Sequence, residues 1–495
     1  MVKMKKTKSI CPVCHNLIDA VIFDNDNKTY IEKNCEDHGT FRDVYWGDSE
    51  EYHRFEKYLH NGNGIANHFI SDKKGCPQDC GICDVHKTNT ILANIDVTNR
   101  CNLRCPICFA NAAASGYLYE PTVEQIHEMM TVLRSQEPVK CTSVQFTGGE
   151  PTMRLDLFHL IRMAKEMGFK HIQLATNGVK LSESANYCYD LRESGLKTVY
   201  LQFDGVNPES YLETRGFNAL PIKLKAIQNC REAKMPIDIV PTVIKGINDH
   251  ELGDMVRFVA DNIDIIKGIN FQPVSFTGRI DSDKREQQRI TIPDVLNNID
   301  EQTNGAIISE DFYPVPFIVP LTNFANAITG FENVEFSIHP HCGAGAHVYV
   351  DNEKKMTPLA RFVDVEGLHE YFDEVALEIE GVRYFKTIAR WRGIRKLLRG
   401  IRQHVDDSNA PKDIDFPKNF INLFVDRSGN AIKVFHKKMM FIGIMHFQDL
   451  YNMDIERIQR CGIHYAVPDG RVIPFCTYNS LYRTEIEKKF SRPLD

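Results

Sequence analysis

The sequence lacks an uninterrupted apolar run long enough to cross a bilayer. Its most apolar stretch, Phe312 to Phe331, contains three prolines, at positions 314, 316 and 320, which would break a spanning helix and leave backbone groups unsatisfied in lipid. We interpret this stretch as a buried or pocket-lining loop followed by a short helix. The basic segment Met1 to Ser9 is not followed by the apolar region of a secretory signal. These absences predict a cytoplasmic location.

The chain also has little that would favour binding to nucleic acid. Its net charge is −7 at pH 7 and its pI is about 6.2, so attraction to an anionic partner would require a local basic cluster. Repeats and low-complexity tracts are absent. At 495 residues the chain is expected to fold as two to four units, because single cores rarely grow beyond about 250 to 300 residues.

Cysteine, in contrast, is abundant and unevenly placed. Of the 15 cysteines, nine fall in or beside C-x2-C and C-x3-C-x2-C groups rather than in the dispersed pairs of a disulfide framework. This pattern predicts metal binding in a reducing compartment.

The group Cys101, Cys105 and Cys108 follows an apolar, strand-like run, Ile91 to Val97. Three thiolates can hold three irons of a 4Fe–4S cubane and leave the fourth iron open to a ligand, whereas a structural cluster normally has four protein ligands. On spacing alone, three of four zinc or closed-cluster ligands would be an alternative.

A second motif favours the open cluster. The run Thr142 to Phe146 leads into Gly148, Gly149 and Glu150. There, two glycines let the backbone approach a ligand closely, and a carboxylate can bind an ammonium group.

Residues 91–300 alternate strand-like and helical patterns six times, which implies a parallel sheet with ligands at the carboxyl ends of its strands. Asn177 and Asp204 follow the third and fourth of these strands, although Asn-Gly and Asp-Gly are also common turns. The predicted strands are Ile91–Val97, Cys141–Phe146, His171–Ala175, Thr198–Phe203, Ile237–Thr242 and Gly268–Phe271, and the clearest predicted helices are Val123–Arg134, Leu155–Met167 and Glu251–Ile263.

Residues 1–55 form a first small unit with three cysteines and one histidine at metal-ligand spacing: Cys11, Cys14, Cys35 and His38. This set suits zinc or a mononuclear iron of rubredoxin type. The ligands alone do not distinguish a structural metal from a redox-active one.

Residues 56–90 contain a second C-x3-C-x2-C group, Cys76, Cys80 and Cys83. We interpret it as an auxiliary cubane, with a zinc knuckle as the alternative. Its fourth ligand would be His86, Cys342, Cys461 or Cys476, or else that iron is open.

The carboxyl-terminal region, residues 301–495, contributes Cys342, Cys461 and Cys476, all within two residues of glycine or proline in loop-like sequence. With the preceding group they make six thiolates, enough for one fully ligated cluster and part of another, or for two clusters with three thiolates each. We favour two auxiliary clusters. Three buried cysteines without a metal are the alternative.

Residues 383–404 carry eight lysines or arginines and no acid, and apolar residues recur among them at helical spacing. The pattern predicts an amphipathic helix with a cationic face. It fits either a peripheral helix with a solvated basic side or contact with an anionic membrane at its inner face, where each basic residue contributes up to about 1 kcal/mol.

The core triad and the Gly-Gly-Glu segment together resemble the radical SAM superfamily, whose open iron binds S-adenosylmethionine (SAM). The resemblance implies an α/β fold: a partial (β/α)6 TIM-type barrel with small Cys-rich amino-terminal metal domains and an α+β carboxyl-terminal domain that holds auxiliary clusters. It also implies that Gly148, Gly149 and Glu150 bind the SAM amino group, and that Asn177 and Asp204 contact its ribose or carboxylate.

Over nearly its full length the chain resembles the archaeal radical SAM family that includes tetraether lipid synthase and class D methyltransferases acting on a pterin precursor. The resemblance rests on the amino-terminal ligand set, the two extra cysteine groups, and the segment Met445 to Asp449 that leads into Cys461 to Gly470. It implies a mononuclear rubredoxin-like iron and three 4Fe–4S clusters, one of which binds SAM.

The resemblance also implies a radical mechanism. An electron from a low-potential donor of ferredoxin or flavodoxin type would allow SAM to be cleaved to methionine and a 5′-deoxyadenosyl radical, which removes hydrogen from an unactivated C–H bond. We predict carbon–carbon coupling between lipid chains as the outcome, because the basic helix and the apolar stretch Pro314 to Leu321 favour a lipid. The alternative is methyl transfer to a 7,8-dihydropterin.

A hypothesis of another class is a non-catalytic iron–sulfur protein that transfers electrons. The intact Gly-Gly-Glu segment argues against it, because such a protein has no need of a SAM pocket.

Overall fold

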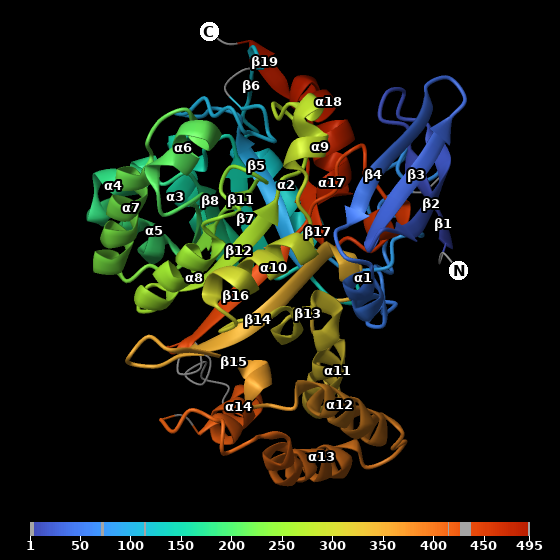
Figure 1. Ribbon diagram of the computed structural model, residues 1–495, viewed down its shortest axis with the longest axis vertical. Helices are drawn as coiled ribbons and strands as arrows, with labels where there is room; N and C mark the ends of the chain where they lie inside the picture. Colours follow the sequence, from blue (N-terminus) through green and yellow to red (C-terminus); the bar gives the residue numbers. More distant parts are fainter. Residues whose placement is uncertain (1–3, 71–73, 113–114, 414, 426–436, 494–495) are drawn as a thin grey trace.

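The computed structural model describes residues 4–70, 74–112, 115–413, 415–425 and 437–493, and a large mixed sheet forms its centre (Figure 1). Six neighbouring strands are parallel and follow the order of the sequence, as predicted for an open (β/α)6 barrel. Their bounds lie within two residues of the predicted ones: β5 (Leu92–Thr98), β7 (Ser143–Gly148), β8 (His171–Thr176), β9 (Thr198–Gln202), β10 (Ile237–Val240) and β12 (Ile266–Pro273).

Helices cover the outer face of this sheet (Figure 1). The first, α2, begins with a capping box between Thr122 and Gln125 and buries Ile126, Met130 and Leu133 on one face. The others along the barrel are α3 (Leu157–Glu166), α4 (Val179–Glu183), α5 (Ala185–Ser194), α6 (Pro208–Arg215), α7 (Leu220–Ala233), α8 (Leu252–Asp261), α9 (Arg285–Gln288) and α10 (Ile292–Thr303), and α2 itself is Val123–Arg134.

The carboxyl-terminal region extends the barrel sheet at both edges. Next to β12 lies the parallel strand β16 (Met439–Met445), which pairs in turn with the antiparallel β14 (Gly343–Val350). On the other side β17 (Ile463–Ala466) runs parallel to β5 and pairs with β18 (Val472–Pro474). Two short strands, β13 (Tyr313–Pro314) and β15 (Met356–Pro358), pair with β14. Strand β11 (Thr242–Val243) pairs with β12 inside the sheet, and β6 (Tyr117–Tyr119) pairs separately with β19 (Ser491–Pro493).

The amino-terminal unit is a separate antiparallel sheet beside the barrel (Figure 1). It is tied to the carboxyl-terminal region, because the buried Lys33 ammonium donates to the Leu450 carbonyl at 2.7 Å and Thr7 donates to the Asp454 carboxylate at 2.6 Å. Its elements are β1 (Met4–Ile10), β2 (Leu17–Asn25), β3 (Lys28–Cys35), β4 (Gly39–Trp46) and the following helix α1 (Ser49–Glu56).

A group of helices with its own hydrophobic core lies at the end of the molecule opposite β6 and β19 (Figure 1). The apolar stretch Phe312 to Phe331, predicted as a buried or pocket-lining loop followed by a short helix, ends in the helix α11, which packs against α12. None of the described helices is both long enough and apolar enough to cross a membrane. The helices here are α11 (Val319–Thr329), α12 (Val365–Glu380), α13 (Lys386–Gly400) and α14 (Phe416–Val425).

Helix α13 is basic, as predicted, but its apolar residues do not form one buried face. The side packed against α12 consists largely of small residues, and a Cβ added at Gly393 would lie 2.5 Å from the Ile379 side chain. Close packing through small residues turns larger apolar side chains outward. The exposed set, which we call the α13 surface, is Tyr384, Phe385, Ile388, Trp391 and Leu398.

Candidate active site and metal centres

A cavity of about 230 Å³ lies at the carboxyl ends of the barrel strands, where the predicted motifs converge. Polar amides and apolar side chains share its wall, including those of Gln145, Gln272 and Phe447. Eight predicted site residues line it: Cys101, Cys105, Cys108, Gly148, Gly149, Glu150, Asn177 and Cys476.

The ends of β5 and β7 are joined by two backbone hydrogen bonds. The Gly149 amide donates to the Thr98 carbonyl at 2.7 Å, and the next amide donates to the Arg100 carbonyl at 2.7 Å. Only glycine permits this approach, because a Cβ at Gly148 would lie 2.2 Å from the Thr98 oxygen and one at Gly149 would lie 2.3 Å from the Arg100 oxygen. Arg100 immediately precedes Cys101, so the same contacts position the start of the cysteine loop.

The Glu150 carboxylate is held rigidly at the wall of the cavity. One oxygen accepts hydrogen bonds from the hydroxyls of Thr152 at 2.6 Å and Thr176 at 2.7 Å, and the other accepts the Asn177 amide at 2.7 Å. The Asn177 side chain in turn donates to Asn102 in the cysteine loop at 2.7 Å. A buried carboxylate fixed in this way is preorganised to accept further hydrogen bonds from a cationic amine.

The core cysteine loop is shaped by its backbone as well as its spacing. The Arg279 guanidinium donates to the Cys105 carbonyl at 2.8 Å, and the Arg279 amide donates to the Cys108 carbonyl at 3.0 Å. Burial, followed by the charges of Glu150 and the other two cysteines, raises the pKa of Cys101 to about 12. A thiolate at this position therefore requires a compensating cation such as iron, which fits a cluster site.

Of the residues predicted to bind SAM, Asp204 alone does not line the cavity. Its carboxylate is fully buried and is paired with Arg215 through contacts of 2.5 and 2.9 Å. Arg215 lines the cavity and also donates to the carbonyl of Ile107, between the second and third cysteines of the loop, at 3.0 Å. We therefore correct the expected SAM contact: Asp204 positions Arg215 against the cluster loop, because its own oxygens are already occupied.

The three carboxyl-terminal cysteines, Cys342, Cys461 and Cys476, meet around a second, smaller cavity. Phe447, Gln448 and Cys476 line both cavities, so the two are neighbours. Burial and the nearby thiols raise the pKa of Cys461 well above its ordinary value and that of Cys476 to about 12. As in the core loop, a metal would offset the cost of thiolates here.

The earlier group, Cys76, Cys80 and Cys83, does not line either cavity. Cys80 lies 3.0 Å from the hydroxyl of Thr477, the residue after Cys476, so the two cysteine groups are close in space. The Nε2 atom of His86, a predicted fourth ligand, faces the Cys461 carbonyl at 2.9 Å and the His464 ring at 3.1 Å. The other three candidates for the fourth ligand, Cys342, Cys461 and Cys476, line the second cavity together.

The amino-terminal ligand set is assembled as predicted. The ligand atoms of Cys11, Cys14, Cys35 and His38 all lie within 4.8 Å of one another, which suits a single ion. No second group of three or more such side chains is as compact within the residues that the structure describes. The wider spacing of the other cysteine groups suits thiolates that bind separate irons of a cluster.

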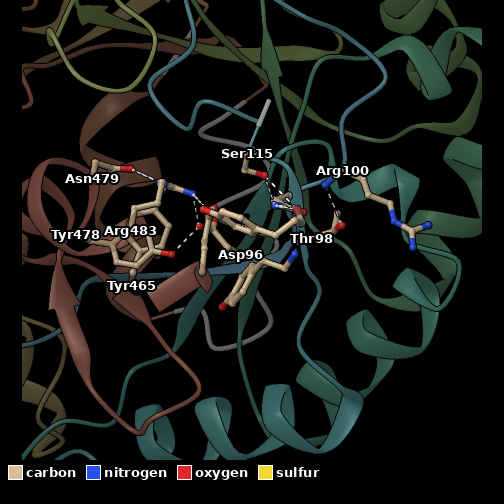
Figure 2. Close-up of polar contacts among 12 residues, drawn as sticks. Asp96, Thr98, Arg100, Ser115, Tyr465, Tyr478, Asn479 and Arg483 are labelled. Atoms are coloured by element: carbon tan, nitrogen blue, oxygen red, sulfur yellow. Dashed lines mark hydrogen bonds and ion pairs between the residues drawn. The ribbon is translucent and has the colours of Figure 1, made fainter. Parts of the chain in front are cut away.

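A buried ion pair connects the barrel to α18 (Arg483–Lys489), the last of three short carboxyl-terminal helices. The other two are α16 (Ile455–Gln459) and α17 (Phe475–Thr477). Arg483 contacts Asp96 of β5 at 2.6 Å and the Asn479 side chain at 2.8 Å (Figure 2). Tyr478 also donates to Asp96 at 3.0 Å. Since Asn479 lines the first cavity, this network fixes one of its walls.

Comparisons with known proteins agree with this architecture. The radical SAM superfamily model matches residues 95–259, and a model described as the HMPTM N-terminal zinc ribbon domain matches residues 3–47. A 7,8-dihydro-6-hydroxymethylpterin dimethyltransferase of Methanocaldococcus jannaschii is 47% identical over 495 residues, covering 99% of this chain and 96% of that protein. A GTP 3′,8-cyclase of Clostridium acetobutylicum is 29% identical over 215 residues, covering 43% of this chain and 65% of that protein.

Among solved structures, the FeFe-hydrogenase maturase HydG from Carboxydothermus hydrogenoformans has a TM-score of 0.35 and 14% sequence identity, covering 44% of this chain and 52% of that one. The full-length similarity to the Methanocaldococcus protein is far stronger. The chain is a radical SAM enzyme and belongs to the family of the 7,8-dihydro-6-hydroxymethylpterin dimethyltransferase of Methanocaldococcus jannaschii.

Proposed function

We propose that this enzyme methylates a 7,8-dihydropterin. The observation that carries the proposal is the 47% identity to a pterin dimethyltransferase over 99% of the chain, with the core site residues around one cavity. The comparisons favour this alternative over the predicted coupling of lipid chains. The apolar stretch that had favoured a lipid, Pro314 to Leu321, does not line the cavity, and its Leu321 packs against the separate helical core.

The polar lining of the cavity suits a heterocycle. A pterin ring presents N–H donors beside carbonyl and ring-nitrogen acceptors, and side-chain amides can pair with both kinds of group. The Gln145 Oε1 atom is buried at the wall without a hydrogen-bond partner in the described part of the chain. Gln272 and Asn479 add further amides to the same wall.

We assign the core residues as follows. Cys101, Cys105 and Cys108 would hold a 4Fe–4S cluster with one open iron, and the carboxylate of Glu150 and the glycine backbone before it would hold the SAM ammonium group. When bound, the cluster and SAM supply a radical that can break a C–H bond. A low-potential ferredoxin or flavodoxin would supply the electron, and Arg215 keeps the cysteine loop in place.

Further metal sites complete the proposed set of cofactors. We propose two auxiliary 4Fe–4S clusters, one at the Cys76 group and one at the Cys342 group, and a single zinc or iron ion at the amino-terminal ligand set. We propose that the chain divides into four units, residues 1–55, 56–90, 91–300 and 301–495, each of which contains one of the metal or cluster sites.

The test is a product assay with anaerobically reconstituted enzyme, dithionite and SAM, with or without 7,8-dihydro-6-hydroxymethylpterin. One-carbon sources are SAM labelled at its methyl group and, in a second arm, methylenetetrahydrofolate. We expect 5′-deoxyadenosine and a pterin that gains one CH2 for each methylation, and neither product from the Cys101→Ala control. An unchanged pterin in both arms, with 5′-deoxyadenosine still formed, would refute pterin methylation.

Peripheral membrane contact is a second proposal, and it rests on the α13 surface. Trp391 is 64% exposed there among exposed aromatic and basic side chains, an arrangement typical of the membrane interface. This observation also keeps lipid coupling as the second candidate function.

The two tryptophans of the chain make this contact measurable, because Trp46 is fully buried and Trp391 is not. Anionic vesicles are expected to shift the fluorescence emission to shorter wavelength, and the shift should weaken in high salt and with zwitterionic vesicles. Trp391→Phe should abolish it. The electrostatic contact would be contradicted if no shift occurred, or if the shift did not depend on lipid charge and salt concentration.

A further inference from the structure

The second cavity contains more than its three cysteines. Cys342 and His446 lie opposite each other where the antiparallel pair β14 and β16 ends, and the His446 amide donates to the Cys342 carbonyl at 3.0 Å. Cys461 follows α16, and Cys476 lies on α17. His446 and Arg457 line the same cavity as the three cysteines.

The His446 imidazole is buried without any hydrogen-bond partner. The residue is 2% exposed, and neither Nδ1 nor Nε2 is satisfied within the part of the chain that the structure describes. Leaving a buried polar group unpaired costs about 1 to 3 kcal/mol. A metal ligand bond removes one of these costs, because a neutral imidazole nitrogen is a common metal ligand.

Arg457 indicates that the occupant of the cavity is anionic. Its guanidinium is almost fully buried, and no carboxylate lies within ion-pair distance of it among the described residues. It donates instead to the Cys342 sulfur at 3.3 Å and to the His446 carbonyl at 2.7 Å, while its Nη1 atom has no partner. A buried cation requires a compensating negative charge, which a thiolate-bound cluster supplies.

We propose that His446 is the fourth protein ligand of an auxiliary 4Fe–4S cluster held by Cys342, Cys461 and Cys476, with Arg457 balancing its charge. The inference rests on the auxiliary cluster of the proposed function but not on the pterin. Such a cluster has no open iron, so its role is to carry electrons beside the active-site cavity rather than to bind substrate at iron. Histidine ligation raises the reduction potential of a cluster relative to cysteine ligation.

The direct test is pulsed EPR on the reduced full-length holoenzyme grown with 15N-labelled histidine, without SAM so that no SAM nitrogen is bound. We expect a strongly coupled histidine nitrogen in the wild type. The coupling should disappear in His446→Ala and in His446→Cys, and the cysteine variant should keep its iron and show a lower midpoint potential.

His339→Ala is the matched control, because His339 is equally buried and has an unpartnered Nε2 but does not line the cavity. It should keep the coupling. The proposal fails if the wild type with full iron content shows no coupled histidine nitrogen, or if the coupling survives in His446→Cys. Neither readout uses the pterin, so failure of methyl transfer would leave this result intact.

Discussion

Replacing Gly149 with alanine is expected to lower the rate of SAM cleavage at least about 100-fold, although no cluster ligand is removed. The added Cβ would lie 2.3 Å from the Arg100 carbonyl oxygen and 2.8 Å from that of Asn99. Both contacts are with backbone, which cannot rotate away. The loop must therefore shift, and a displacement of about 1 Å at a catalytic site can cost 100-fold in rate.

The shift would act on two groups together. It would break the hydrogen bond from the Glu150 amide to the Arg100 carbonyl, and so move the carboxylate away from the start of the cysteine loop. The measurement is 5′-deoxyadenosine formation per cluster, together with the change that SAM causes in the EPR spectrum of the reduced enzyme. We expect both to be lost at nearly normal iron content.

Gly246→Ala is the matched control. Gly246 has a φ of +77°, so alanine there carries about 1 to 2 kcal/mol of backbone strain, but its Cβ would meet nothing within 4 Å. This variant should be slightly less stable and still cleave SAM. Equal activity of the two variants would show that the close approach at Gly149 does not position the site.

The barrel and its core motif were predictable from the sequence because their signals are local. A buried parallel strand has a continuous apolar sequence, and a cysteine group or a Gly-Gly-Glu turn can be recognised where such a run ends. Since the carboxyl ends of parallel strands share one edge of a sheet, placing Glu150 near Cys101 needed no long-range information. The same reasoning placed Asp204 at this edge but gave no indication that its carboxylate is paired with Arg215.

The long-range parts were not predictable. Nothing local in Met439–Met445 or Ile463–Ala466 indicates that these strands extend the two opposite edges of the barrel sheet. Without knowledge of that pairing, the sequence allowed several ways of dividing the cysteines between clusters, and a common site for Cys342, Cys461 and Cys476 was only one of them. The exposed α13 surface was missed for a related reason, because periodicity identifies an apolar stripe but not which side packs through small residues.

Replacing Arg483 with methionine is expected to lower the free energy of unfolding by about 3 to 5 kcal/mol, the usual cost of removing one partner from a buried ion pair. Arg483 is 6% exposed and faces two buried carboxylates, those of Asp96 at 2.6 Å and Glu487 at 3.1 Å. Methionine fills part of the volume but leaves both carboxylates without a countercharge. Anaerobic urea unfolding followed by circular dichroism measures the loss.

The loss of unfolding free energy caused by Arg483→Met should grow as pH rises. Burial raises the pKa of Asp96 even in the wild type, where Arg483 opposes the shift, so removing Arg483 raises this pKa further. A carboxyl group whose pKa is higher in the folded than in the unfolded state contributes stability that is lost as pH rises above its ordinary range near 4. The deficit of Arg483→Met should therefore be smaller at pH 5 than at pH 8, and Asp96→Asn in the same chain should restore part of it.

The control for this prediction is Arg492→Met in the same carboxyl-terminal segment. The Arg492 side chain is 64% exposed and lies 3.8 Å from Glu120, so its loss should cost less than about 1 kcal/mol and show little pH dependence. Arg483 also holds Asn479 and, through Asp96, the first barrel strand, so the destabilised variant should show weakened cavity binding before it unfolds. If both variants lost the same small amount, the carboxyl-terminal helices would not depend on the buried pair, and the cavity wall that they form would be held by apolar packing alone.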